Sequence, residues 1–445
     1  MPETILFKNM NMVLPQGPAC QDLYLQGGRI ADIGVEINKQ ADHVIHDPEL
    51  VILPGIIDPH VHFREPGYEY KEDIQSGSMA AAAGGVTSFF DMPNTNPATI
   101  TLNALNQKRE IAEKKSCVNY GFFFGAEENN FNELKKLTNC PGIKLYLGSS
   151  TGSLLLNNRN VLEKLFKQTS IPIAVHAEDE EIIRNNTLKY SGELNDVNKH
   201  EKIRSVDAAV NAVKVAVDLA LTHKKRLHIC HVSTEEEVDY LSEVYASVSN
   251  ASLLITAEVT PHHLFLDNSS YERLGTLAQV NPPIREKRHQ AALWQGLKQG
   301  VIQCVATDHA PHLLSEKQLP YGQAPSGVPG IETMLPLLLN AVNQKQCSLD
   351  DVVKWLSFNT ASVFNIHSKG RIEANFDADL TIIDLNLMKT VKNDLLVTKC
   401  KWSPFNGLEL KGWPVMTIVN GRIVYKNGKF LNGNSGREIL IKPGH

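Results

Sequence analysis

Short apolar runs alternate with amphipathic stretches along the middle of the chain. The apolar runs predict β-strands near residues 56–63, 86–92, 118–125, 142–147, 172–178, 226–232, 253–260 and 302–308. Helical periodicity fills much of the sequence between them, for example at 102–115, 206–222 and 235–245, and a further helix is predicted at 348–365. Eight repeats of strand and helix predict an α/β fold of the (β/α)8 TIM-barrel type.

The two ends of the chain have a different pattern, in which glycines and prolines interrupt short β-type runs without helical periodicity. These runs lie at 4–7, 23–25 and 44–45, and again at 378–383 and 415–419, followed by a predicted hairpin at 421–428. At 445 residues the chain exceeds the roughly 250 to 300 residues at which a single core stops growing. We therefore predict a small β-sandwich domain built from residues 1–53 and 372–445, with the barrel of residues 54–371 inserted between its halves.

Composition narrows the class of protein. The formal net charge is −5, acidic and basic residues are interspersed, and no basic stripe or polybasic run indicates binding to nucleic acid or to a membrane. No window reaches the roughly 18 apolar residues of a membrane span, and the N-terminus does not resemble an export signal. The seven cysteines are widely spaced, without a Cys-x-x-Cys pair, which favours reduced thiols and a cytoplasmic location.

Side chains that can bind metal lie at the C-terminal ends of most of the predicted barrel strands. They are His60 and His62 on the first strand, Lys144 on the fourth, His176 on the fifth, His231 on the sixth and Asp308 on the eighth. A TIM barrel has its active site at this end, whereas a doubly wound sheet gives no reason for chemistry at most strand ends. His60 and His62 alone could equally be core histidines bonded to backbone groups. Because ligand-type residues recur on further strands, the set predicts a metal site.

Lys144 lies within the apolar segment Gly-Ile-Lys-Leu-Tyr-Leu. Burial disfavours the charged form of an amine, and a neutral amine can react with CO₂ to give a carbamate whose two oxygens can bridge two cations. The alternative is a lysine that extends to solvent and keeps its charge. Beside four histidines and an aspartate, the carbamate is the preferred interpretation. His228 precedes His231 by three residues, an unfavourable offset on a strand, and is expected to be structural.

Three further residues near these strand ends suit an anion. Arg64 follows His62, Asn94 follows the second strand, and His312 lies four residues after Asp308. The guanidinium group of arginine matches a carboxylate in shape and charge. A surface arginine without a partner is an equally good interpretation from sequence position alone. Asp308 itself could bind a metal and also move a proton, as in a metal-dependent hydrolase.

Several motifs carry a resemblance to a known family. They are DPHVHFREPG at 58–67, DMPNTNP at 91–97, GIKLYLGSSTG at 142–152, VHAED at 175–179, HVST at 231–234, EVTPHHL at 258–264, NPPIR at 281–285, ATDHAPH at 306–312, PSGVPGIET at 325–333 and DADL at 377–380. Over nearly its whole length the chain resembles the dihydroorotases of the amidohydrolase superfamily. Allantoinases and dihydropyrimidinases share several of these motifs, but they do not typically combine His-x-His-x-Arg with Met-Pro-Asn-Thr.

The resemblance implies two Zn²⁺ ions, one held by His60, His62 and Asp308 and the other by His176 and His231, with N6-carboxylysine at Lys144 bridging them. It also implies that a bridging hydroxide attacks the substrate, that Asp308 moves the proton, and that the substrate carboxylate and ring have separate binding residues. The carboxylate would be bound by Arg64, Asn94 and His312, and the pyrimidine ring by Asn281 and the backbone of Ser326 and Gly327. Many bacterial relatives have aspartate in place of Lys144, which puts in doubt any detail taken from them.

The activity that the resemblance implies is the reversible cyclisation of N-carbamoyl-L-aspartate to L-dihydroorotate in pyrimidine (UMP) synthesis. Two rival interpretations are another cyclic-amide hydrolase, such as an allantoinase or hydantoinase, and an inactive homologue that serves as a structural partner of aspartate transcarbamoylase. Such a homologue is expected to have lost metal ligands, whereas this chain has all six. A homodimer and an association with aspartate transcarbamoylase are both compatible with the resemblance, and no residue pattern favours either.

Overall fold

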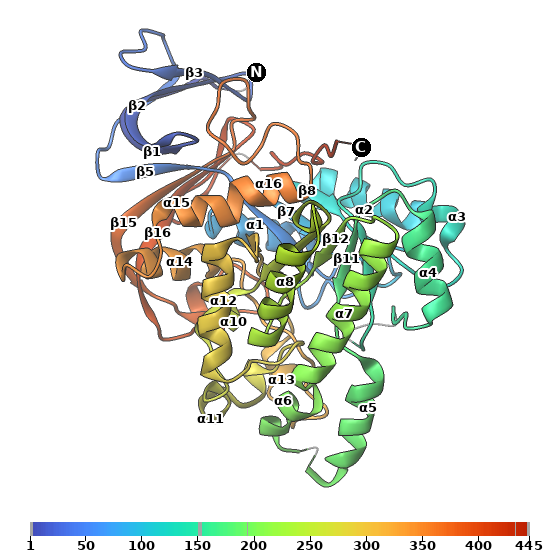
Figure 1. Ribbon diagram of the computed structural model, residues 1–445. Coiled ribbons are helices and arrows are strands. Elements are labelled where there is room, and N and C mark those ends of the chain that lie inside the picture. Colours follow the sequence, from blue (N-terminus) through green and yellow to red (C-terminus); the bar gives the residue numbers. More distant parts are fainter. Residues whose placement is uncertain (1–2, 150–153, 194, 432, 443–445) are drawn as a thin grey trace.

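The computed structural model describes residues 3–149, 154–193, 195–431 and 433–442 (Figure 1). Parallel strands surround the centre of its larger part, in two hydrogen-bonded groups. The first group is β6 (Ile56–Val61), β7 (Val86–Asp91) and β8 (Asn119–Phe122). The second group is β9 (Phe124–Gly125), β10 (Ile143–Tyr146), β11 (Ile173–His176), β12 (Leu227–Ile229), β13 (Ile255–Val259) and β14 (Cys304–Val305).

The two groups join into a closed barrel. β8 and β9 are halves of one strand interrupted at Phe123, whose N–H donates to the carbonyl of Asp91 on β7 at 3.0 Å. At the other edge the N–H of His62, just after β6, donates to the carbonyl of His309, just after β14, at 2.8 Å. The described residues therefore form eight parallel strands in a ring, which confirms the predicted TIM barrel. Each strand coincides with one of the predicted apolar runs.

Helices cover the outside of the barrel, where α7, α8 and α12 lie side by side (Figure 1). The larger helices are α1 (Ile74–Ala83), α2 (Leu102–Lys115), α4 (Arg159–Gln168), α5 (Glu180–Lys189), α7 (Val206–Thr222), α8 (Glu235–Ser247), α12 (Lys287–Gln299) and α14 (Met334–Asn343). Local sequence explains their limits, since the side chain of Thr234 caps α8 and exchanges hydrogen bonds with Glu237. On α7, Ala209, Ala212 and Ala216 are buried at helical spacing.

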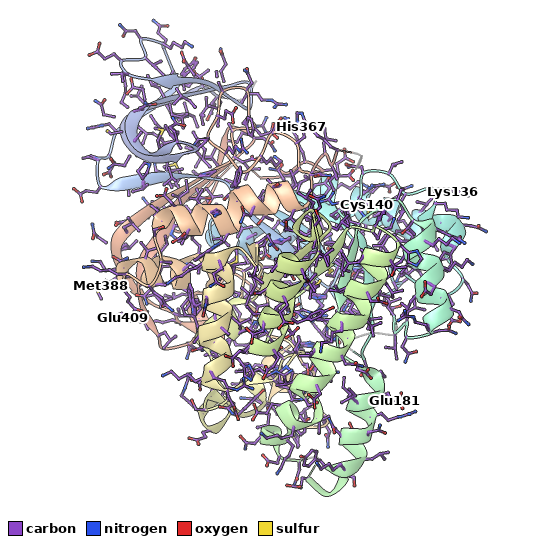
Figure 2. The ribbon with its side chains drawn as sticks, viewed as in Figure 1. Lys136, Cys140, Glu181, His367, Met388 and Glu409 are labelled. Carbon is purple, nitrogen blue, oxygen red and sulfur yellow. The ribbon has the colours of Figure 1, made fainter. Side chains whose placement is uncertain are left out.

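Both ends of the chain contribute strands to one further sheet, in the order β18-β17-β16-β15-β5-β1-β2-β3, with β4 paired to β1. Their bounds are β1 (Ile5–Leu14), β2 (Gly17–Gln26), β3 (Arg29–Gly34), β4 (His43–Ile45), β5 (Leu50–Pro54), β15 (Leu380–Thr390), β16 (Glu409–Val419), β17 (Arg422–Lys426) and β18 (Lys429–Phe430). Phe7, Ile52 and Ile418 share a core of their own. Figure 2 shows Met388 and Glu409 on β15 and β16 at the outer margin of the molecule. The small β domain is thus confirmed, whereas its boundaries at 53 and 372 stay a prediction.

The hairpin predicted at 421–428 is wrong. The segment contains one strand, β17, which pairs with β16 on one side and β18 on the other. Turns at both of its ends cause this arrangement, because Asn420 and Gly421 have φ of 50° and 75°, and Asn427 and Gly428 have φ of 47° and 83°. Two consecutive residues with positive φ are characteristic of tight hairpin turns, and Asn-Gly is the preferred pair.

Residues beyond β18 return to the barrel, since the N–H of Tyr120 on β8 donates to the carbonyl of Arg437 at 3.0 Å. In the described part of the chain, no helix combines the length and apolar character needed to cross a membrane.

Candidate active site

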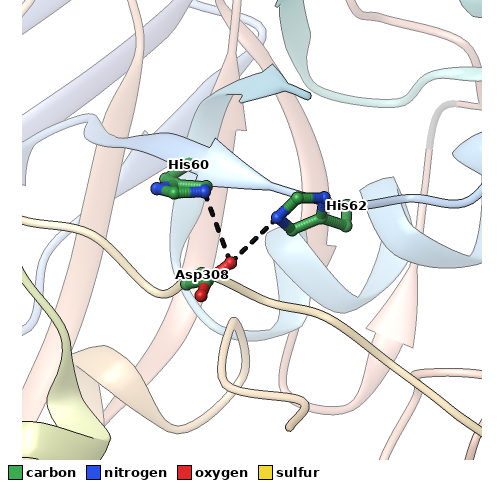
Figure 3. A group of neighbouring side chains, drawn as sticks. All are labelled: His60, His62 and Asp308. Carbon is green, nitrogen blue, oxygen red and sulfur yellow. Dashed lines mark ion pairs between the residues drawn. The ribbon is translucent and has the colours of Figure 1, made fainter. Parts of the chain in front are cut away.

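His60, His62 and Asp308 meet where the first and last barrel strands end. Nε2 of His60 and Nε2 of His62 lie 3.3 and 2.9 Å from the same oxygen, Oδ1 of Asp308 (Figure 3). Both histidines are buried, and the Asp308 side chain is 13% exposed. Burial opposes ionisation of Asp308, but the neighbouring His60 and His62 hold its pKa well below the usual value. The sequence prediction that these three residues share one site therefore agrees with the geometry.

Buried oxygen atoms orient both histidines. Nδ1 of His62 lies 2.7 Å from Oδ1 of Asn94, and Nδ1 of His60 lies 2.5 Å from Oε1 of Glu258. The other carboxylate oxygen of Glu258 lies 3.0 Å from Nε2 of His228, so that His228 supports the site instead of facing it. Burial opposes ionisation of Glu258, yet these two imidazoles lower its pKa. Where each Nδ1–H donates to its oxygen, Nε2 of His60 and Nε2 of His62 face Asp308.

His176 and His231 form a second buried pair beside the first cluster. Nδ1 of His176 lies 3.0 Å from Nε2 of His231, and their rings are in edge contact. Nε2 of His176 lies 3.0 Å from the buried carboxylate of Glu178, which also pairs with Arg204. Burial lowers the pKa of both histidines, which favours the neutral imidazole that binds metals. Nδ1 of His231 is buried without a hydrogen-bond partner.

Lys144 lies on β10 between these clusters and is 1% exposed. Its Nζ lies 3.0 Å from Sγ of Cys230 and 5.2 Å from the centre of the Tyr146 ring. It lines the same pocket as all four histidines and Asp308. The lysine thus does not extend to solvent, which removes the alternative that sequence left open.

The spacing of these side chains suits metal ions. Ligand atoms at about 2.0 to 2.1 Å from a tetrahedral Zn²⁺ ion lie roughly 3.3 Å from one another, and the nitrogen and oxygen separations of 2.9, 3.0 and 3.3 Å are close to this value. His60, Cys230 and Glu258 form a second, overlapping group of ligand-type atoms. A third group, Glu235, Glu236 and His289, lies elsewhere, and Arg288 already pairs with both of its carboxylates.

The residues predicted to bind substrate surround the same pocket. Its lining contains, besides the predicted metal ligands, Arg64, Asn94, Asn281, Ser326 and Gly327. Oδ1 of Asn281 is buried and has no hydrogen-bond partner. Gly327 has a φ of 134°, and a Cβ there would lie 2.7 Å from the carbonyl oxygen of Ala310, so that this close approach needs glycine.

His312 stands directly behind the pocket wall. It is 1% exposed, and its Nε2 lies 3.1 Å from Nη2 of Arg64 and 3.1 Å from the carbonyl oxygen of Ser326. Nε of Arg64 donates to the carbonyl of Pro311 at 3.1 Å, which fixes the guanidinium plane. All twelve residues predicted from sequence are therefore brought into one region, with His312 one layer further from its centre.

Backbone conformation distinguishes several of these residues. Arg64, His231 and Asp308 have φ of 64°, 38° and 46°, in the left-handed region that residues other than glycine seldom adopt. Such conformations cost on the order of 1 to 3 kcal/mol each and persist where surrounding contacts enforce them, often at functional sites. Each of the three follows a barrel strand, so the turn directs the side chain towards the centre of the barrel mouth.

Sequence reasoning missed four residues of the site, namely Tyr146, Cys230, Glu258 and Ala310. Tyr146 could have been found, since it lies two residues after Lys144 and shares its strand face. Glu258 stands in the motif EVTPHHL, and nothing in that motif indicates its contact with His60. The contacts of Cys230 and Ala310 depend on residues far away in sequence, and no local signal marks them.

Comparison with known proteins places this site in a family. The sequence pattern of the amidohydrolase family matches residues 51–424. A dihydroorotase from Methanosarcina acetivorans is 36% identical over 98% of this chain and 97% of its own length, and one from Pyrococcus furiosus is 36% identical over 95% and 92%. Among solved structures, an L-hydantoinase (dihydropyrimidinase) from Arthrobacter aurescens superposes with a TM-score of 0.94 at 27% identity, over 99% of this chain and 100% of that one. The chain therefore belongs to the amidohydrolase family and, within it, to the group of the dihydroorotases.

Proposed function

We propose that this enzyme interconverts L-dihydroorotate and N-carbamoyl-L-aspartate in pyrimidine synthesis and acts in the cytoplasm. The observation that carries the proposal is the position of Arg64, which lines the pocket with His60, His62 and Asp308 and whose Nη2 lies 3.1 Å from Nε2 of His312 behind it. Dihydroorotate is a cyclic amide with a carboxylate on the ring. A clamp for an anion next to a hydrolytic centre is the arrangement that this substrate needs.

The proposal assigns two Zn²⁺ ions to the site. His60, His62 and Asp308 would hold one and His176 and His231 the other, with Lys144 as N6-carboxylysine between them. When bound, the ions would supply a hydroxide at neutral pH and polarise the amide carbonyl. The lowered pKa of the buried His176 and His231 and the 3.0 Å separation of their facing nitrogens support this assignment.

The protein's own residues would position the substrate and move the proton. Arg64, His312 and the amide nitrogen of Asn94 would bind the ring carboxylate, and Asn281 with the backbone of Ser326 and Gly327 would bind the ring edge. Although burial opposes its ionisation, His60 and His62 hold the pKa of Asp308 well below the usual value, so its carboxylate could accept the proton of the attacking water and deliver it to the ring nitrogen as the carbon–nitrogen bond breaks. In the direction of ring closure, the same transfers run in reverse.

Two rival activities make different demands on the site. A hydantoinase or allantoinase acts on rings that lack this carboxylate, so Arg64 and His312 would have no anion to bind. An inactive structural homologue would have no need for intact ligands, whereas this chain keeps its histidines, Lys144 and Asp308 in one pocket. The curated relatives at 36% identity are dihydroorotases, which agrees with the clamp.

The test is hydrolysis of dihydroorotate by the purified, zinc-loaded enzyme, with dihydrouracil and hydantoin as matched substrates that lack the carboxylate. Dihydroorotate is expected to be turned over with a kcat/KM at least about tenfold higher than either, which corresponds to one charge-assisted contact. Metal analysis should give two zinc ions per chain. Equal rates on all three substrates would point to a general cyclic amidase, and a metal-loaded protein without activity on any of them would support the inactive homologue.

A further inference from the structure

His312 lies between two cationic side chains. Its Nε2 lies 3.1 Å from Nη2 of Arg64, and its Nδ1 lies 3.0 Å from Nζ of Lys71. Lys71 belongs to the loop between β6 and α1, and its ammonium group also pairs with Glu316 at 3.0 Å. The side chain of Lys71 is 13% exposed and that of His312 is 1% exposed, so water does not compete freely for this contact.

These contacts determine which nitrogen of His312 carries hydrogen. Lys71 and Arg64 both donate and cannot accept, so the neutral ring can accept from only one of them. The carbonyl oxygen of Ser326, 3.1 Å from Nε2, decides between them because it needs a donor. With the hydrogen on Nε2 the ring donates to Ser326 and accepts from Lys71 at Nδ1, whereas a hydrogen on Nδ1 would face the ammonium group, so the Nε2–H tautomer makes more hydrogen bonds. A doubly protonated ring is disfavoured between Lys71 and Arg64, and burial together with these cations lowers the pKa of His312 well below its usual value.

In this tautomer, His312 and Arg64 present two donors to each other and cannot form a hydrogen bond between themselves. The Nε2–H of His312 donates to Ser326, and the Nη2–H of Arg64 is left for an acceptor in the pocket, such as a carboxylate. In the opposite tautomer, Nε2 would accept from Arg64, and this guanidinium donor would be lost to the ligand. Carboxylate binding thus depends on Lys71, which contacts Nδ1 on the other side of the His312 ring.

We propose that Lys71 is a positioning residue for substrate recognition, which holds His312 as the Nε2–H tautomer so that His312 does not accept from Arg64 and the guanidinium group donates to the substrate carboxylate. This inference rests on the proposed function and assigns a role to a residue outside the pocket lining. One oxygen of Glu316 pairs with Lys71 at 3.0 Å, and the other lies 3.8 Å from Nδ1 of His312, too far for a hydrogen bond that would set the tautomer.

The kinetic test compares Lys71→Met with Lys71→Arg and with the control Glu316→Gln. Lys71→Met should raise KM for dihydroorotate and weaken inhibition by orotate, which carries the same carboxylate, by at least about tenfold each, with kcat changed less than about threefold. Lys71→Arg restores a donor and should recover most of the affinity, while Glu316→Gln should stay within about threefold of the wild type. An unchanged KM in a folded Lys71→Met enzyme would overturn the inference. So would an equal loss in Glu316→Gln, since the ion pair alone would then explain the effect.

A spectroscopic measurement makes the test independent of how the variants fold. Nitrogen-15 NMR of the wild-type enzyme, with the His312 signals identified by their loss in His312→Gln, should show Nε2 protonated and Nδ1 unprotonated. The reverse pattern would refute the role of Lys71. If the wild type fails to hydrolyse dihydroorotate, the proposed function fails, whereas the tautomer assignment still stands or falls by this spectrum.

Discussion

Oε1 of Glu258 lies 2.5 Å from Nδ1 of His60, and both side chains are 1% exposed. The carboxylate fixes the hydrogen of His60 on Nδ1 and leaves Nε2 directed at Asp308. Partners of this kind orient a ligating histidine and increase its basicity, and their loss costs about 10- to 100-fold in metal affinity.

Glu258→Gln is therefore expected to lower zinc affinity by about 10- to 100-fold, measured by competition with a chelator. The amide can still contact His60, so the fold should be retained, as circular dichroism would show. Glu181→Gln, on the exposed surface of α5, is the matched control and should bind zinc like the wild type. Equal affinities in the two variants would mean that Glu258 does not orient His60.

Removal of Lys144 tests the bridging carbamate. Lys144→Ala should lose both zinc ions and activity, and short carboxylic acids such as acetate or propionate should restore part of the turnover by replacing the missing bridge. The same acids should not rescue Asp308→Asn, whose bridge is intact. A Lys144→Ala enzyme with two metals and normal activity would contradict the carbamate.

Asp308→Asn tests the proton transfer. The amide keeps the shape of the side chain but cannot accept a proton at the pH of the assay, so kcat should fall by about 10² to 10⁴ while part of the metal is retained. Metal content and kcat should be measured on the same sample. Turnover near that of the wild type would show that another residue carries the proton.

Arg64→Met tests recognition of the carboxylate. One charge-assisted hydrogen bond contributes about 1.5 to 3 kcal/mol, so kcat/KM for dihydroorotate should fall at least about tenfold. Dihydrouracil lacks the carboxylate, so it should be a very poor substrate of the wild type. Arg64→Met should lower kcat/KM for dihydrouracil little further. If both substrates lose equally, Arg64 supports the fold or the metal ligands and does not bind the substrate.

Glu332 provides a prediction on stability. It accepts hydrogen bonds from the backbone of Val397 and Thr398, and burial raises its pKa from 4.5 to about 7. Between these pH values the folded state binds this proton and the unfolded state does not, so this carboxyl lowers the free energy of unfolding as pH rises. Glu332→Gln cannot titrate, and its stability relative to the wild type should therefore increase from pH 4.5 to pH 7. Urea denaturation at both pH values measures this difference, and a constant difference would contradict the raised pKa.

The barrel was predictable because its signals are local. Each strand is an apolar run, and the helix at Leu102–Lys115 has the limits that its periodicity indicates. The ligand-type residues were predictable because the carboxyl ends of parallel strands meet at one face. The prediction of a hairpin at 421–428 is wrong because the Asn-Gly turns at 420–421 and 427–428 each reverse the chain, so that the residues between them form one strand.

The missing parts of the site depend on contacts between distant segments. Lys71 reaches His312 across 241 residues, and Lys144 reaches Cys230 across 86 residues. No periodicity or motif spacing contains such information. The left-handed backbone of Arg64 is equally invisible in the sequence, since arginine has no preference for it.

The closure of the barrel has a second consequence for the proposed metal site. The N–H of Thr307 donates to Oδ1 of Asp58 at 3.0 Å, although the two residues are 249 positions apart, so the first and last strands meet along a seam. His60 and His62 lie on one side of that seam and Asp308 on the other. The ligand set is incomplete until the barrel closes. A cation bound by these residues would therefore stabilise the closed barrel relative to every open form. Chelation should therefore speed the opening of the barrel as well as stop turnover.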